Sequence, residues 1–388
     1  MTDPIRVLHC PMLVGGSPQQ LARSERSLGL ASRAVAFSQN YINYECDEIL
    51  WRDDDSTARR EFKRWKLLHR ALTAFDVIHF NCGLTILPHR IDARPGPTSL
   101  LHGILRLAYW AYGRLFYLED LRLLRRAGKA IFVTYQGDDA RQSDFCRASF
   151  DIHFADEVPP GYYSRASDDR KRQEIALFDK YADGIFALNP DLLRVLPARA
   201  QFMPYATVDP ADWRPGEYRP GTRPRPLVVH APSHQGVKGT RFVVDAVNRL
   251  KSEGVEFDFV LVEKVSRAEA RRIYERADLL VDQLLSGWYG GVAVEMMALG
   301  KPVVCYLRES DLRFLDPEMR SDLPLVNATP GGIYATLRDL LAGRRRRLAE
   351  LGDASRRYVE KWHNPEKIAT RLKNCYEAAL SKNRCAAR

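Results

Sequence analysis

Short apolar segments alternate with longer amphipathic segments along most of the chain. The apolar segments have the length of β-strands, and the amphipathic ones repeat apolar positions with helical spacing. This alternation is typical of an α/β protein. In the first half, the predicted strands are Ile5–Cys10, Arg33–Phe37, Asp76–Phe80, Ala130–Tyr135 and Gly184–Asn189, and the clearest helices are Gln19–Leu28 and Glu61–Ala74.

A proline-rich segment, Val208–Pro226, interrupts this pattern. Proline lacks a backbone donor and fixes φ, so the segment cannot continue a helix or a central strand, and it is the best candidate for a linker. The alternation restarts directly after it. Two α/β units of comparable size predict two Rossmann-like domains with a cleft between them. The later predicted helices are Thr240–Glu253, Arg267–Ala277, Val292–Leu299 and, around a break at Pro365, the tail Arg357–Leu380.

Composition and charge narrow the class of protein. The 388 residues are 45% hydrophobic and 28% charged, which suffices for two cores without disulfides. Seven scattered cysteines without a CxxC pair argue against a structural zinc site and for a reducing compartment. The chain starts like a strand rather than a signal peptide and lacks an apolar run of about 20 residues. We therefore expect a cytoplasmic protein that could also associate peripherally with the cytoplasmic face of a membrane.

The most informative segment is the strand–turn–helix Leu279–Val304. Gly290 and Gly291 open its helix; glycine lets a backbone approach a ligand closely, and the free amides and dipole of a helix start attract anions. Glu295 lies about one turn further on, where its carboxylate could bind two ribose hydroxyls. A tight turn with Glu295 as a capping or solvated residue is the alternative explanation.

A second loop of this kind follows the first strand of the second unit. It carries His234, Lys238 and Gly239, and a helix begins near Thr240. Lys238 could supply positive charge to a diphosphate, and a solvated loop lysine is the alternative. Because both loops follow strands of one sheet, they are expected to converge on the crevice at its carboxyl edge.

Together, the segments around these loops resemble family 4 retaining glycosyltransferases. The resemblance is carried by VKGTRFVVDAVNRLKSEG and ADLLVDQLLSGWYGGVAVEMMALGKPVV, and more weakly by VLHCPMLVGGSPQQLARSERSLG and YVEKWH. It implies the two-domain GT-B fold, a UDP- or GDP-sugar donor, retention of anomeric configuration, no obligatory metal or cofactor, and a last helix that crosses back onto the first domain. The expected domains are residues 1–212 on the acceptor side, a linker at 213–226, a donor domain at 227–360, and the crossover helix and tail at 361–388.

Individual positions match or depart from the family's motifs. Lys238 matches its phosphate-binding lysine, and Glu295 matches the second glutamate of its E-x7-E motif, which usually binds the ribose. The position of the first glutamate is occupied by Gly287. The arginine that the family has a few residues before the lysine is absent, and His234 is its nearest substitute. Gln136 stands where a histidine often contacts the donor sugar. The candidate catalytic residues are Lys238, Glu295 and Gly16, and the donor-binding candidates are Gly15, His234, Gly239, Tyr289, Gly290, Gly291 and Val292.

Loops after strands of the first half supply the acceptor side. Gly15 and Gly16, which the resemblance places near the transferred sugar, could equally form an ordinary strand–helix turn. His79 could be a packed strand histidine, and Asp138 and Asp139 could cap the next helix. The acceptor-side candidates are His79, Asn81, Gln136, Asp138 and Asp139.

Retaining transfer asks for little proton chemistry from the protein. It needs positive charge and N–H dipoles at the leaving group, and an acceptor hydroxyl placed against the anomeric carbon. We therefore expect a front-face displacement in which Lys238 and the Gly290–Val292 amides hold the departing diphosphate.

The net charge of +10 suggests a polyanionic partner, namely a nucleotide, an anionic membrane surface or a nucleic acid, and the charge alone does not choose among them. Ala58–Leu72 interleaves six Lys or Arg residues with large apolar ones, and Leu100–Phe116 is rich in Leu, Tyr and Trp. Both segments could lie on an anionic membrane, or could pack on the first sheet with a basic outer face. A nucleic-acid partner rests on charge alone, since no recognition motif is present.

The sequence therefore predicts a glycosyltransferase whose acceptor is a glycan, a lipid-linked sugar or a small molecule, in polysaccharide, glycolipid or glycosylated-metabolite biosynthesis. Gly287 and Gln136 motivate an alternative, a catalytically silent GT-B-like protein that binds a sugar nucleotide or a partner. A nicotinamide-dependent enzyme is disfavoured, because the G-x-G-x-x-G fingerprint with a downstream acidic residue is missing.

Overall fold

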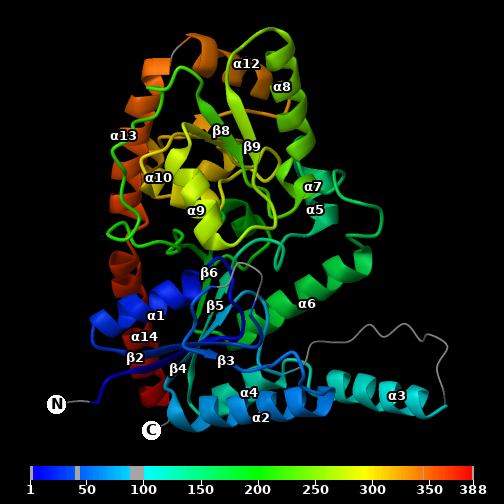
Figure 1. Cartoon of the computed structure of the whole chain (residues 1–388). Helices are drawn as coiled ribbons and strands as arrows, with labels where there is room; N and C mark the ends of the chain where they lie inside the picture. Colours follow the sequence, from blue (N-terminus) through cyan, green and yellow to red (C-terminus); the bar gives the residue numbers. More distant parts are fainter. Residues whose placement is uncertain (1–2, 40–43, 88–99, 344, 387–388) are drawn as a thin grey trace.

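The computed structural model describes residues 3–39, 44–87, 100–343 and 345–386, which form two parallel sheets with helices on both faces (Figure 1). The first sheet has the strand order β3-β2-β1-β4-β5-β6-β7, and the second has the order β12-β11-β10-β8-β9. The predicted α/β class with two Rossmann-like units is confirmed. The strands of the first sheet are β1 (Arg6–Cys10), β2 (Ala31–Ala36), β3 (Glu48–Ile49), β4 (Val77–Asn81), β5 (Ala130–Tyr135), β6 (Gly184–Ala187) and β7 (Gln201–Phe202).

Helices cover both faces of the first sheet. Apolar residues of α2, α4 and α6 pack with the strands in one core cluster, whereas α1 packs on the opposite face. Ser164 begins α6 with a capping box, which satisfies amides that the helix leaves without partners. The helices are α1 (Ser17–Ser27), α2 (Thr57–Ala74), α3 (Leu100–Leu115), α4 (Glu119–Arg126), α5 (Ser143–Ser149), α6 (Arg165–Tyr181) and the 3-10 helix η1 (Pro190–Arg194).

The second sheet is built from β8 (Leu227–His230), β9 (Asp258–Leu261), β10 (Leu279–Val281), β11 (Val303–Cys305) and β12 (Val326–Asn327). Its inner strands are fully buried, as expected for parallel strands covered on both faces. The helices of this half are α7 (Gln235–Lys238), α8 (Thr240–Ser252), α9 (Arg267–Arg276), α10 (Gly291–Ala298), η2 (Glu309–Phe314), α11 (Pro317–Ser321), α12 (Ile333–Arg338) and the π-helical turn η3 (Asp339–Gly343).

The chain returns to the first half through its last two helices. α13 (Arg345–Trp362) packs on α10, and α14 (Pro365–Ala386) packs on α1 beside the first sheet (Figure 1). The expected tail helix is therefore two helices that are separated at Pro365, and the expected crossing back to the first half is confirmed.

The proline-rich connection contains no helix or strand between residues 203 and 226. It is nevertheless held in place, because Trp213 is buried and Arg356 of α13 donates hydrogen bonds to the carbonyl groups of Trp213 and Pro210. One core cluster contains residues from both halves, including Phe202 and Trp288, whose rings meet edge to face at 5.8 Å. The two halves are thus packed against each other.

Candidate functional site

The loop after β8 and the turn before α10 meet at the carboxyl edge of the second sheet. A Cβ atom built on Gly290 would lie 3.0 Å from Nζ of Lys238, so the lysine reaches the backbone at the start of α10. Its Nζ donates a hydrogen bond to the side-chain oxygen of Gln283 at 2.5 Å. The Gln283 amide in turn donates to the carbonyl of the buried Trp288. Lys238 is therefore an anchored lysine with only 16% of its side chain exposed.

A carboxylate lies in the middle of this cluster. Asp282 follows β10 directly; its Oδ2 accepts a hydrogen bond from the Gly290 amide at 2.6 Å, and its Oδ1 lies 3.8 Å from Nζ of Lys238. The anion-attracting start of α10 thus holds one of the protein's own anions. Sequence reasoning missed Asp282 and Gln283, although their position directly after the strand that leads into Gly290 is a usable signal.

Glu295 is buried on the first turns of α10 and pairs with Arg267, the first residue of α9. The Arg267 guanidinium donates to Oε1 of Glu295, with Nη2 at 3.1 Å and Nε at 3.2 Å. Burial raises the pKa of the Glu295 carboxyl, and Arg267 opposes this shift. Glu295 is therefore neither a solvated residue nor a helix cap. Sequence reasoning also missed Arg267, which is signalled only by its place at the start of the helix after β9.

A small pocket of about 100 Å³ opens beside this ion pair. It is lined by Ser233 after β8, Glu263 after β9, Val292 and Glu295 of α10, and Tyr44 of the first half. A wider hollow of about 590 Å³ shares Tyr44 and Arg267 with it and reaches Gly16. The Arg267 guanidinium lies 5.1 Å from the centre of the Tyr44 ring and 5.2 Å from the Trp213 ring, so aromatic rings flank the cation.

The glycine turn after β1 faces the start of α10 across the two halves. Cβ atoms built on Gly15 and on Gly291 would each lie 3.7 Å from the same methyl group of Thr207. Gly15 and Gly16 both have positive φ, and a Cβ on Gly16 would lie 2.9 Å from the Tyr44 ring, so larger residues are unfavourable here. The Thr207 hydroxyl is buried without a hydrogen-bond partner among the described residues.

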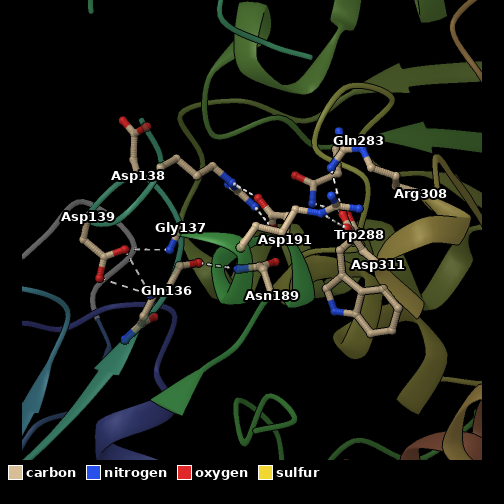
Figure 2. A network of polar contacts seen from close by, with 12 residues as sticks. Gln136, Gly137, Asp138, Asp139, Asn189, Asp191, Gln283, Trp288, Arg308 and Asp311 are labelled. Atoms are coloured by element: carbon tan, nitrogen blue, oxygen red, sulfur yellow. Dashed lines mark hydrogen bonds and ion pairs between the residues drawn. The ribbon is translucent and has the colours of Figure 1, made fainter. Parts of the chain in front are cut away.

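One of the two aspartates in the loop after β5 stabilises the loop through hydrogen bonds to backbone amides. Asp139 accepts hydrogen bonds from the backbone amides of Gln136, Gly137 and Gly83, and burial raises the pKa of its carboxyl against these donors (Figure 2). Asp138 is exposed and accepts a hydrogen bond from the Tyr163 hydroxyl at 2.5 Å. The Gln136 amide nitrogen is buried without a partner among the described residues. Asp138 and Gln136 thus retain bonding capacity, whereas Asp139 stabilises the loop.

Three other candidates have buried side chains that take part in packing. His79 hydrogen-bonds the Tyr376 hydroxyl at 2.7 Å and the Thr134 hydroxyl at 2.8 Å, and burial lowers its pKa well below the usual value. Asn81 is buried at the end of β4 and donates to the His79 carbonyl. Tyr289 is buried, and its hydroxyl lies 2.8 Å from Nε2 of His363. The polar contacts of these three side chains are with residues other than Lys238, Gln283 and Asp282.

The loop that contains Lys238 also contacts a segment of the first half. His234 caps α7 by accepting a hydrogen bond from the Val237 amide, and its ring meets that of Tyr162 at 4.9 Å. Gly239 has φ +75°, and leucine side chains lie within 3.5 Å of where its Cβ would stand. Both residues shape the loop.

The position expected for a first motif glutamate is closed by Arg308. Gly287 has φ +76°, and a Cβ on it would lie 2.6 Å from Nη1 of Arg308. Arg308 pairs with Asp311 at 3.0 Å, donates to the carbonyl of Ile152 and covers the Phe150 ring at 3.6 Å. Figure 2 shows Arg308 and Asp311 on one side of the view, and Gln136, Gly137 and Asp139 on the other.

Two further properties of the described residues bear on the sequence predictions. Among them, no three His, Cys, Asp or Glu side chains are grouped so that they could hold a metal ion. None of the described helices combines the length and the apolar character needed to cross a membrane.

Comparison with known proteins places this site in a known fold. No protein-family profile and no characterised protein sequence matches the chain significantly. Solved structures do match over the whole chain. Sucrose-phosphate synthase from Thermosynechococcus elongatus is 14% identical with a TM-score of 0.56, and the match covers 98% of this chain and 100% of that one.

Two further structures align in the same way. HepE of Anabaena in complex with UDP-glucose is 12% identical with a TM-score of 0.57, over 96% of this chain and 99% of that one. The catalytic domain of starch synthase IV from Arabidopsis thaliana, bound to ADP and acarbose, is 10% identical with a TM-score of 0.58. The match covers 98% of this chain and 100% of that one. The chain therefore has the GT-B fold of glycosyltransferases.

Proposed function

We propose that this protein is a glycosyltransferase that moves a sugar from a UDP- or GDP-sugar to a hydroxyl acceptor with retention of configuration. The observation that carries the proposal is the meeting of Lys238 with the Gly290 backbone at the start of α10, beside the pocket of Tyr44, Arg267 and Glu295. Structures with the same fold are described as complexes with UDP-glucose or ADP. The donor would bind to residues 227–360 and the acceptor to residues 1–212.

The pocket beside α10 would hold the nucleoside. Glu295 would accept hydrogen bonds from the ribose hydroxyls, and its contact with Arg267 opposes the rise in pKa that burial causes. The flat guanidinium of Arg267 and the Tyr44 ring could both lie against a base. The pocket of about 100 Å³ is small for a whole nucleoside, so binding would widen it toward the adjoining hollow of about 590 Å³.

The diphosphate would take the place that Asp282 now fills. The first amides of a helix lack acceptors within the helix, so those of Gly291 and Val292 are available to a phosphate, together with Lys238. As the glycosidic bond to the diphosphate breaks, these groups would stabilise the charge that develops on the leaving oxygen. The Asp282 carboxylate repels an incoming phosphate, and donor binding would therefore require it to move.

The acceptor would enter from the loops of the first half. Gly15 and Gly16 leave the backbone close to the start of α10, and Asp138 and Gln136 can still form hydrogen bonds with hydroxyls. A glycan, a lipid-linked sugar or a small hydroxylated molecule fits these groups chemically.

One observation favours a second candidate function. The resemblance implies a carboxylate near the donor sugar at position 287. This chain has Gly287 there, and Arg308 fills the space that a side chain would need, so the carboxylate is missing. A protein that binds a sugar nucleotide without transferring the sugar would need no such group.

The first experiment is a calorimetric titration of the protein with UDP, GDP, ADP and dTDP. For the nucleotide that binds, Lys238→Ala should weaken binding by about tenfold or more, since it removes a charge-assisted hydrogen bond of about 1.5–3 kcal/mol. Asp282→Asn should tighten it by about tenfold, because a buried like charge is lost. Lys251→Ala and Asp245→Asn on α8 are the matched controls and should change nothing.

The outcomes separate the candidate functions. No binding of any nucleoside diphosphate by the wild-type protein would refute the donor site. Binding that is lost in Lys238→Ala, without hydrolysis of the sugar nucleotide or transfer to any acceptor, would support the silent binding protein. Transfer by the wild-type protein that is lost in Lys238→Ala would support the enzyme.

A further inference from the structure

Two helices on the side of the first half that faces away from the second sheet expose apolar side chains to solvent. Among the large apolar residues that the structure describes, the three most exposed are Phe62 of α2 at 69%, Leu107 of α3 at 64% and Leu115 of α3 at 69%. Figure 1 shows α2 and α3 at the end of the molecule opposite the second sheet, with α3 projecting beyond the other helices. Apolar exposure is thus concentrated on one part of the molecule.

One side of α3 accounts for its attachment to the protein. Tyr109 and Tyr112 both donate hydrogen bonds to the Glu61 carboxylate of α2 at 3.0 Å, and Trp65 of α2 donates to the Tyr112 hydroxyl at 2.7 Å. The Phe116 ring meets the Trp65 ring edge to face at 5.1 Å. These contacts fix α3 on α2 through the face that carries its tyrosines.

The other side of α3 has an apolar stripe. Leu107, Ala111 and Leu115 are all exposed and recur every fourth residue, so they lie on one face of the helix. Arg114 is exposed next to this stripe, and its guanidinium lies 4.9 Å from the centre of the Trp110 ring. A cationic head beside an aromatic ring and leucines is typical of residues that sit at the boundary between lipid headgroups and acyl chains.

The charge of α2 complements an anionic surface. Six of its eighteen residues are Lys or Arg, against the single acidic residue Glu61. Several of these cations are used internally, since Lys63 pairs with Asp55 and Arg70 pairs with Glu48. Lys66 is exposed. Arg59 also lies 3.8 Å from Asp55, but 63% of its side chain is exposed, so both cations are accessible from solvent.

We propose that the α2–α3 pair docks the protein onto the surface of an anionic lipid bilayer, with Leu107 and Leu115 entering the headgroup region and Arg59, Lys66 and Arg114 contacting lipid phosphates. The helices lie on the bilayer rather than crossing it, in keeping with their length and composition. The apolar stripe distinguishes this surface from one that binds nucleic acid, which would contact phosphates without exposed leucines. The proposal does not depend on the donor site.

Vesicle flotation of the full-length protein tests the proposal. The vesicles are phosphatidylcholine alone, or phosphatidylcholine mixed with phosphatidylglycerol, at low and at high salt. The wild-type protein should float with the mixed vesicles at low salt. The double variant Leu107→Glu/Leu115→Glu should lower the vesicle partition coefficient at least tenfold, and Arg59→Glu/Lys66→Glu about tenfold or more.

Leu261→Glu is the matched control, because it places the same charge on an exposed leucine of the second half, and it should float like the wild-type protein. Circular dichroism and the nucleotide titration should be unchanged in all variants. The proposal is overturned if the wild-type protein does not float with the anionic vesicles, or if Leu107→Glu/Leu115→Glu floats equally well. It is also overturned if duplex DNA displaces the protein from vesicles while the leucine variants behave as wild type, since the surface would then bind nucleic acid.

Discussion

Position 287 carries no side chain, and the Arg308 guanidinium fills the space that a side chain would need. The backbone there has φ +76°, which costs any residue other than glycine conformational energy. Arg308 is held on three sides by Asp311, the Ile152 carbonyl and the Phe150 ring. A glutamate at this position is therefore excluded by both conformation and packing, and the departure from the motif is built into the structure.

We expect Gly287→Ala to lower the free energy of unfolding by more than the strain of positive φ, which is about 1–3 kcal/mol. The added Cβ would lie 2.6 Å from Nη1 of Arg308, so the buried arginine must also shift. Gly254→Ala is a matched control with φ +80° and open space around the new methyl group. Urea denaturation of both variants measures the difference, and equal losses would show that Arg308 does not occupy the site.

At the scale of elements, the junction between α13 and α14 depends on a buried histidine. His363 lies between the Tyr289 hydroxyl, 2.8 Å from its Nε2, and the Tyr205 carbonyl, 2.8 Å from its Nδ1. Tyr289 precedes the glycines that start α10, so this junction is connected to the candidate donor turn. Burial lowers the pKa of His363 from 6.5 to about 4.

Acidification should therefore destabilise this junction. The unfolded chain binds a proton at His363 near pH 6.5, whereas the folded chain binds it only near pH 4. The free energy of unfolding therefore falls as the pH drops through this window, by roughly 3 kcal/mol for this group. His363→Asn should lose this part of the pH dependence, although the variant is less stable at neutral pH. His69→Asn on the exposed face of α2 is the control. Denaturation curves measured between pH 4 and pH 7 check both slopes, and an unchanged slope in His363→Asn would contradict the prediction.

At the scale of the whole molecule, a buried charge network connects the two halves. Arg194 of η1 and Arg308 both bind the fully buried Asp311 carboxylate, at 2.5 Å and 3.0 Å. The Phe150 ring lies against both guanidinium groups, at 5.4 Å and 3.6 Å. These contacts join η1 of the first half to the segment around η2 of the second half.

We expect Asp311→Asn to destabilise the protein by about 3–5 kcal/mol, because it leaves buried cations without their counter-charge. If the network holds the halves together, the variant should also show a larger radius of gyration in small-angle X-ray scattering and earlier proteolysis in residues 203–226. Asp353→Asn is the control, since its pair with Arg219 is exposed. A stable variant with unchanged scattering would mean that the apolar core alone sets the arrangement.

Much of this protein could be predicted from local sequence. Apolar runs predict the central strands because parallel strands are buried on both faces, and the proline-rich segment marks the change between the two sheets. The break at Pro365 is also local. The short edge strands β3, β7 and β12 were not predicted, since two residues carry no periodic signal. The convergence of Lys238 and Gly290 follows from strand order, because loops after parallel strands share one edge.

Other features are decided only by the tertiary structure. Residues such as His79 and Tyr289 look like site residues in sequence, but contacts with Tyr376 and His363, distant in the chain, place their side chains in the packing. The same holds for the Arg267–Glu295 pair and for Arg308 over Gly287, whose partners are 28 and 21 positions apart. A sequence shows which groups follow which strands, and only the packed chain determines whether a side chain faces a ligand, a counter-charge or the core.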